Sequence, residues 1–172
     1  MRKNPLCLGR QVDLFKKSVK EYLPSLQMYN NKAAQLSGHI AKSLFIVHMG
    51  SDDYLLNYFV PNGTTAQQYN PEQFADLLVT ELGKSLQDLY NLGARKLSVF
   101  GISPLGCLPC ILDKMKTETR CVESLNDVVK VFNTKLEAKL KELGSTLKGS
   151  TFIMGNIYTI AREILENPSS YG

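Results

Sequence analysis

The sequence predicts an α/β protein, a three-layer sandwich with helices on both faces of a parallel sheet. Segments with apolar residues at helical spacing alternate with short strand-like segments at residues 43–49, 97–100 and 150–156, an order typical of doubly wound folds. These segments predict about three central strands, and the continuous apolar run of residues 44–47 predicts that the first strand is buried on both faces. The sequence contains no repeat, low-complexity tract or linker, so we expect a single domain over residues 1–172.

The first 49 residues are expected to form two helices and a strand. Residues 11–27 carry apolar side chains at helical spacing, and Pro24 is expected to end or kink this helix. A short second helix through Leu36 is expected to stop at the Ser-Gly-His sequence of residues 37–39. The first strand then covers residues 43–49.

A loop over residues 61–73 leads into a long helix and the second strand. Asn70 is a typical N-cap, and Pro71 is favoured at the first helical position. Gly93 is expected to end this helix, because glycine readily adopts the left-handed conformation that follows many helices.

The last third is expected to hold a polar loop, a long helix, the third strand and a final helix. The loop covers residues 110–122, and the helix covers residues 124–143 and ends at Gly144. Asn167 and Pro168 are expected to stop the final helix.

Charge and hydropathy argue against two classes of partner. The net charge is +4 and the basic residues are scattered, so we expect no nucleic-acid partner. No apolar run approaches the roughly 20 residues of a transmembrane segment. The N-terminus has only a three-residue apolar step and is no signal peptide, which predicts either a cytoplasmic protein or a chain that is missing its true beginning.

The cysteines favour the second of these alternatives. Cys107 and Cys110 form a C-x-x-C pair with Cys121 nearby and no histidine close to them, which argues against a metal site. Pro109 is the one feature in favour of a thioredoxin-like pair. A loop disulfide between two of these three cysteines fits better, with Cys7 elsewhere. Asn62 begins an N-glycosylation sequon, and together these features indicate a secretory origin.

A candidate site is expected where the parallel strands end. The carboxyl ends of such strands meet at one rim of the sheet, which brings together residues 50–54, residues 103–107 and Asn156. Asp52 and Asp53 are adjacent carboxylates in the first of these segments.

Four ordered blocks resemble the plant GDSL-type esterase/lipases of the SGNH hydrolase group. The blocks are residues 44–59 (Gly-Ser-Asp-Asp-Tyr after a strand), 89–109, 121–143 and 156–172. The resemblance implies an SGNH-hydrolase or flavodoxin-like sandwich with a five-stranded parallel sheet. It further implies secretion, no cofactor, and hydrolysis of a small ester or lipid by a Ser nucleophile with a His base and an Asp.

The sequence departs from this family at the catalytic residues. It contains neither Gly-Asp-Ser nor Asp-x-x-His, so none of the catalytic triad is assigned. In the family, an Asn side chain of the first of the four blocks helps to form the oxyanion hole. Of that block the sequence keeps Gly50, Asp52 and Asp53, with Asp52 where the family has Asn. An ionised Asp accepts hydrogen bonds and donates none, and losing one oxyanion donor costs about 2.7–4 kcal/mol. Asp53 is expected to hold the turn through backbone N–H groups.

The resemblance also concerns the cysteines, the sheet edge and Asn156. It implies a Cys107–Cys121 disulfide, which would contribute on the order of 3 kcal/mol. Asn156 stands where the family often has Asp. The visible strands would be the third to fifth of the family sheet, which leaves the edge of strand 43–49 unpaired and open to a partner. We therefore expect a truncated product, a gene fragment or a chain that needs a partner strand.

Other nucleophiles and bases are weighed against ordinary structural roles. His48 is expected to be packed and hydrogen-bonded, and His39 to face solvent. Ser51, Ser98 and Ser103 lack the sequence context of a nucleophile.

Three hypotheses follow from the sequence. The first is a truncated or impaired family member, and the second is a genuine esterase with further blocks in the natural protein. The third is a non-catalytic binding or interaction module on the same scaffold.

Overall fold

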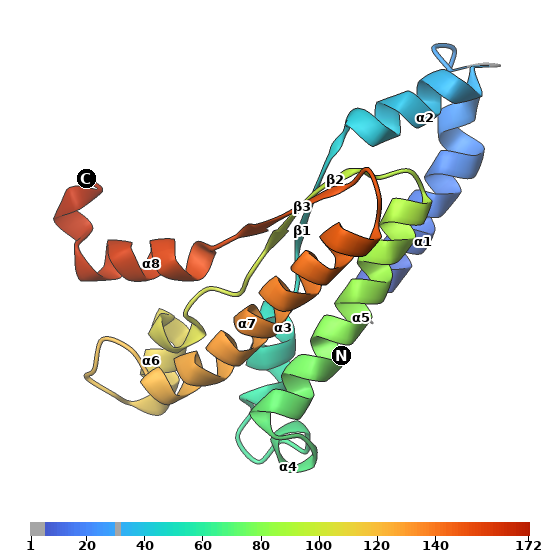
Figure 1. The fold of residues 1–172 in the computed structure, drawn as a ribbon. Helices are drawn as coiled ribbons and strands as arrows, with labels where there is room; N and C mark the ends of the chain where they lie inside the picture. Colours follow the sequence, from blue (N-terminus) through green and yellow to red (C-terminus); the bar gives the residue numbers. More distant parts are fainter. Residues whose placement is uncertain (1–5, 30–31) are drawn as a thin grey trace.

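The computed structural model describes residues 6–29 and 32–172 (Figure 1). The basic residues at positions 2 and 3, which enter the prediction about the N-terminus, lie outside the described residues. The α/β class is confirmed. Strands β1 (Leu44–His48), β2 (Lys96–Phe100) and β3 (Thr151–Gly155) form one parallel sheet in the order β1-β2-β3.

Two long helices, α5 (Pro71–Asn91) and α7 (Glu123–Thr146), lie side by side against the sheet, as Figure 1 shows. Both have an apolar stripe at helical spacing, and this stripe forms the core together with alternate residues of the strands. Val99 of β2 and Leu136 of α7 are fully buried in this core.

The predicted ends of α5 are confirmed. The side chain of Asn70 accepts a hydrogen bond from the Gln73 N–H at 2.9 Å, and the Gln73 side chain accepts one from the Asn70 N–H at 3.0 Å. This capping box satisfies two backbone donors that the helix itself leaves free. Gly93 follows the helix with a φ of 108°.

The N-terminal helix is longer than predicted at its start. α1 (Leu8–Lys17) continues as the π-helix η1 (Ser18–Tyr22) and the 3-10 helix η2 (Leu23–Ser25). Pro24 lies in the last of these segments, so the prediction that it ends the helix is confirmed.

The prediction that the second helix stops at residues 37–39 is wrong, because α2 (Ala33–Lys42) continues through them. Leu36 and Ile40 are one turn apart and both are buried, so burial of this face outweighs the weak helix propensity of the residues between them.

Three further predictions about helices and loops need correction, and one is confirmed. The loop of residues 61–73 contains a short helix, and the loop of residues 110–122 begins with one. Helix α7 passes Gly144, where an added Cβ would meet nothing within 4 Å, and ends before Gly149 with its φ of 74°. The last helix ends before Pro168, as predicted. The remaining elements are α3 (Ser51–Asp53), η3 (Tyr54–Tyr58), α4 (Thr65–Gln68), η4 (Leu105–Cys107), α6 (Pro109–Met115), α8 (Ile157–Glu166) and η5 (Pro168–Ser170).

The prediction that the first strand is buried on both faces is wrong for the described part of the chain. Side chains alternate between the faces of a sheet, so Val47 points to the helices and is buried. On the other face Leu44, Ile46 and Ile153 are 59%, 67% and 57% exposed. Among residues 6–29 and 32–172, the sheet is therefore covered by helices on one face.

Candidate functional site

The rim at the carboxyl end of β1 depends on a tight turn at Gly50. Its φ is 112°, a conformation that favours glycine, and it is followed directly by α3. A Cβ at this position would lie 2.9 Å from Cδ1 of Ile102 and 3.3 Å from Cζ of Phe132. The turn can therefore pack directly against the loop after β2 and against α7.

Helix α7 also holds the loop that follows β2. The Asn133 side chain accepts a hydrogen bond from the Ile102 N–H at 2.7 Å and donates one to the Ile102 carbonyl at 2.8 Å. Two turns earlier in α7, Oδ1 of the fully buried Asn126 accepts a hydrogen bond from the Gly106 N–H at 2.8 Å. Residues 50–54 and residues 103–107, which the sequence predicted to share one rim, both contact α7.

Asn156, the third predicted rim residue, has a structural role. Its Oδ1 accepts a hydrogen bond from the Thr159 N–H at 3.1 Å, and it caps α8. An Asn three residues before Thr159 at the start of an amphipathic stretch is the sequence signal that could have identified this cap.

The two adjacent carboxylates differ in environment. Asp52 is exposed, whereas Asp53 is half-buried and lines a cavity of about 430 Å³ together with Met49, Gly50 and Phe132. Burial raises the pKa of the Asp53 carboxyl, and the negative charge of Asp52 raises it further, while a backbone hydrogen bond opposes the shift. Ionisation of Asp53 is therefore less favourable in this turn than in a free aspartate, because it places a second negative charge beside Asp52.

Tyr54 is a packing residue that sequence reasoning did not single out. Its side chain is fully buried, and its ring contacts those of Phe74 at 5.2 Å and Phe132 at 6.0 Å between centroids. Burial raises the pKa of its phenol, and its hydroxyl has no hydrogen-bond partner among the described residues. The closely spaced aromatic residues Tyr54, Tyr58 and Phe59 were the available sequence signal.

The two histidines lie apart from the rim turn. His48 is exposed on the open face of the sheet beside the Phe100 ring, at 6.4 Å between centroids, so the prediction of a packed histidine is wrong. His39 is exposed, as predicted, although it lies within α2. In the described part of the chain neither imidazole is hydrogen-bonded to a serine. Ser51 begins α3, Ser98 lies within β2 and Ser103 lies in the loop after β2.

The cysteine region brings α7 and α8 together. Cys107 and Cys121 form a disulfide, and Cys7 and Cys110 are exposed free thiols. Arg162 of α8 forms an ion pair with Glu123 of α7 at 2.6 Å. Sequence reasoning missed Arg162, because its partner is 39 residues away in the chain. Within the described ranges, no three His, Cys, Asp or Glu side chains are grouped as a metal site would need.

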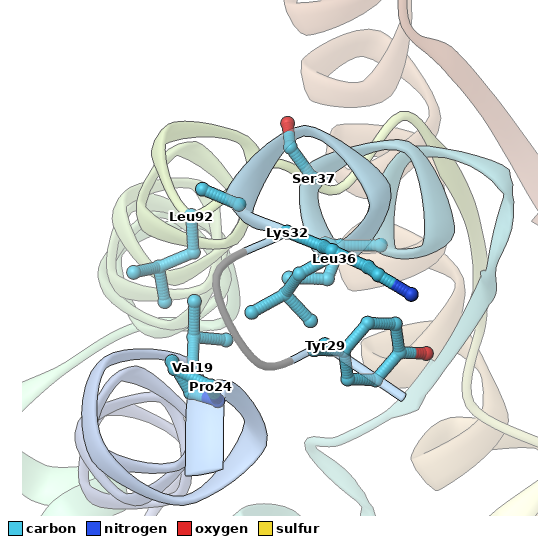
Figure 2. A pocket seen from close by; sticks show the side chains of 9 residues that line it. Val19, Pro24, Tyr29, Lys32, Leu36, Ser37 and Leu92 are labelled. Carbon is cyan, nitrogen blue, oxygen red and sulfur yellow. The ribbon is translucent and has the colours of Figure 1, made fainter. Parts of the chain in front are cut away.

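A cavity of about 570 Å³ lies away from this rim (Figure 2). It is lined by α2 and the end of the N-terminal helix, with Val19, Pro24 and Leu36 on its walls and Leu92 at one side. Leu92 lies shortly before the first residue of β2, so the cavity is at the opposite end of the sheet from Gly50.

The comparisons with known proteins identify the family of this chain. A model of the family described as GDSL-like lipase/acylhydrolase matches residues 8–171. The chain is 37% identical to GDSL esterase/lipase 7 of Arabidopsis thaliana over 86% of this chain and 41% of that protein. Two further GDSL esterase/lipases of the same plant are 39% and 35% identical over 81% and 96% of this chain and 36% and 43% of their own lengths.

The chain thus spans less than half the length of these curated relatives. In the parts that the structure describes, no helix combines the length and the apolarity that crossing a membrane requires. The match of the family model over almost the whole chain, together with the parallel sheet, leads to one conclusion: the chain belongs to the GDSL-like lipase/acylhydrolase family.

Proposed function

We propose that the protein acts in the hydrolysis of small esters or lipids, and that residues 1–172 by themselves are impaired in this reaction. The observation that carries the proposal is the pair of adjacent carboxylates, Asp52 and Asp53, at the rim of the sheet. The resemblance implies that an Asn amide at position 52 would donate to the developing oxyanion. An exposed Asp52 carboxylate instead repels that charge.

The sequence supports the same proposal. The 172 residues contain neither Gly-Asp-Ser nor Asp-x-x-His. For the reaction of the family, a Ser nucleophile and a His base have to be supplied from outside these residues. The described segment contributes the turn at Gly50 and the loop after β2, which Asn133 fixes to α7.

A colorimetric assay tests this proposal. The 172-residue protein is incubated with p-nitrophenyl acetate beside a heat-denatured sample, and we expect equal rates. Turnover above the denatured control would show that the chain is a competent esterase. In that case Asp52→Asn should raise kcat by about 10²-fold or more if position 52 faces the oxyanion. Asp53→Asn is the matched control, because it removes the neighbouring charge without providing a donor at position 52.

A non-catalytic binding or interaction module is the second candidate function. It is favoured by the open face of the sheet, where Leu44, Ile46 and Ile153 are exposed, and by the position of β1 at the edge of the described sheet. A free strand edge can pair with a further strand. Light scattering during gel filtration tests this function. Association that grows with concentration supports it, and a monomer at all concentrations argues against it.

We further propose that the protein is secreted. The Cys107–Cys121 disulfide is typical of oxidising compartments, and Asn62 of the glycosylation sequon is exposed, as glycan attachment requires. Expression through the secretory pathway of a eukaryotic host should give a glycosidase-sensitive mass increase. The Asn62→Gln variant should lack this increase. If Asn62 of the parent stays unmodified, the sequon no longer supports secretion and the disulfide alone does.

A further inference from the structure

Two side chains place N–H donors on the sulfurs of the disulfide. Nδ2 of Asn126 lies 3.4 Å from Sγ of Cys107, and the side chain of Asn126 is fully buried. A guanidinium nitrogen of Arg162 lies 3.3 Å from Sγ of Cys121 and 3.6 Å from Sγ of Cys107. Helices α7 and α8 therefore each present one donor to the same disulfide.

These donors favour the reduced state of the two cysteines. A disulfide sulfur is neutral and accepts hydrogen bonds weakly, whereas a thiolate is an anion that a nearby cation stabilises. Stabilising the reduced form makes a disulfide a stronger oxidant and easier to reduce. Arg162 is held in place by ion pairs with Glu123 at 2.6 Å and Glu166 at 2.9 Å, and these carboxylates offset part of its charge.

The two sulfurs differ in what surrounds them. Cys107 lines an apolar cavity of about 310 Å³ between the loop after β2 and α8, and Pro104, Leu108 and Ile164 also line it. Cys121 is not among the residues that line this cavity. It is the sulfur nearer to Arg162. A thiol that enters the cavity would therefore reach Cys107, with Cys121 on the side of the guanidinium.

We propose that the Cys107–Cys121 disulfide is a site of thiol–disulfide exchange with a dithiol reductant. One thiolate of the reductant attacks Sγ of Cys107, the S–S bond breaks, and Cys121 leaves as a thiolate beside Arg162. The second thiol of the reductant then displaces Cys107 from the mixed disulfide. The reductant is oxidised to a disulfide, and the two cysteines take up the two protons that it loses.

The first test measures the equilibrium in a Cys7→Ser, Cys110→Ser background, which removes the two free thiols. The protein is equilibrated with mixtures of reduced and oxidised dithiothreitol, and its thiols are trapped with a maleimide. Arg162→Met should require an about tenfold higher ratio of reduced to oxidised reagent for half-reduction, and Arg162→Lys a smaller change.

Arg120→Met is the matched control. Arg120 directly precedes Cys121 in the loop between α6 and α7, and it donates a hydrogen bond to the Leu165 carbonyl at 2.8 Å. It therefore also holds α8 in place, but it makes no hydrogen bond to either sulfur. Its half-reduction ratio should stay within about twofold of the parent. Equal shifts in both variants, or no shift in Arg162→Met, would overturn the role of Arg162.

The second test needs no change at Arg162 and so does not depend on whether that variant folds. The oxidised parent is treated briefly with glutathione, and free thiols are alkylated at once. Peptide mass spectrometry should find glutathione on Cys107 and the alkyl group on Cys121. Glutathione mainly on Cys121, or no exchange under conditions that reduce an exposed disulfide, would contradict the proposal.

Discussion

Asn133 of α7 holds both backbone hydrogen-bonding groups of Ile102. Its side chain accepts from the Ile102 N–H at 2.7 Å and donates to the Ile102 carbonyl at 2.8 Å. The Ile102 side chain in turn fills the space beside Gly50, where no Cβ would fit without displacement. One helix side chain therefore fixes the loop after β2, and that loop fixes the turn after β1.

Replacing Asn133 by Ala should destabilise the protein by about 1–3 kcal/mol, because a partly buried backbone donor and acceptor both lose their partner. Urea unfolding followed by circular dichroism measures the change. Thr134→Ala is the matched control on the exposed side of the same helix and should change the free energy of unfolding by less than about 0.5 kcal/mol. Equal losses in the two variants would contradict the role of Asn133.

Replacing Gly50 by Ala should destabilise the protein by about 1–3 kcal/mol, since an L-residue is strained at a φ of 112° and its Cβ would meet Ile102. Gly144→Ala is the control, and it is expected to change the stability in the opposite direction. Gly144 lies within α7 with nothing near an added Cβ, so this change should stabilise the protein by up to about 1 kcal/mol. Thermal unfolding measures both variants, and a neutral Gly50→Ala would refute the packing argument.

The sequence predicted the elements whose signals are local. The N-cap at Asn70 and the stop before Pro168 depend on neighbouring residues and were predicted. The continuation of α2 through residues 37–39 was missed, because it depends on Leu36 and Ile40 packing against elements elsewhere in the chain. The exposed face of β1 was missed for a similar reason, since apolarity reports what a strand can bury and not what covers it.

Asp53 should make the protein less stable as the pH rises from acid to neutral. Its pKa in the folded protein is raised above the usual 3.8 by burial and by Asp52, so the folded state binds more protons than the unfolded state between the two values. The contribution of Asp53 to stability is therefore greatest below pH 3.8 and declines as the pH rises through the raised pKa. Asp53→Asn should gain stability over the parent along that window.

Two measurements check this linkage. Urea unfolding across the acid range should show a difference between Asp53→Asn and the parent that widens as the pH rises and then levels off. Carboxyl NMR titration of Asp52→Asn should give a lower Asp53 pKa than the parent, because the second cause of the shift is removed. An Asp53 pKa unchanged by Asp52→Asn would rule out the coupling between the two carboxylates.

The rim was predictable from the sequence in its position and only partly in its contacts. Strand ends and glycines placed residues 50–54 and 103–107 together. The amides of Asn126 and Asn133 that organise the loop lie on α7, 20 and 31 residues after their backbone partners. Arg162 contacts the disulfide from still farther along the chain. Polar residues on a helix are usually solvated, so only three-dimensional proximity separates these three from their neighbours.

The open face of the sheet gives the last prediction. Ile46 and Ile153 lie on either side of Ser98 in one row across the three strands, and they are 67% and 57% exposed. Replacing both by Lys should leave the free energy of unfolding within about 1 kcal/mol of the parent, because little burial is lost. The same change should weaken self-association, since it places charges on an exposed apolar patch.

Analytical ultracentrifugation over a range of concentrations measures the association, and Val47→Ala is the contrasting variant on the covered face. Val47 is 6% exposed, so its truncation should cost about 1–3 kcal/mol while leaving the open face unchanged. If the double Lys variant unfolded as readily as Val47→Ala, the face would be buried in solution. Both faces of β1 would then be equally covered, because the loss of stability on substitution is proportional to the buried apolar area that the substitution removes.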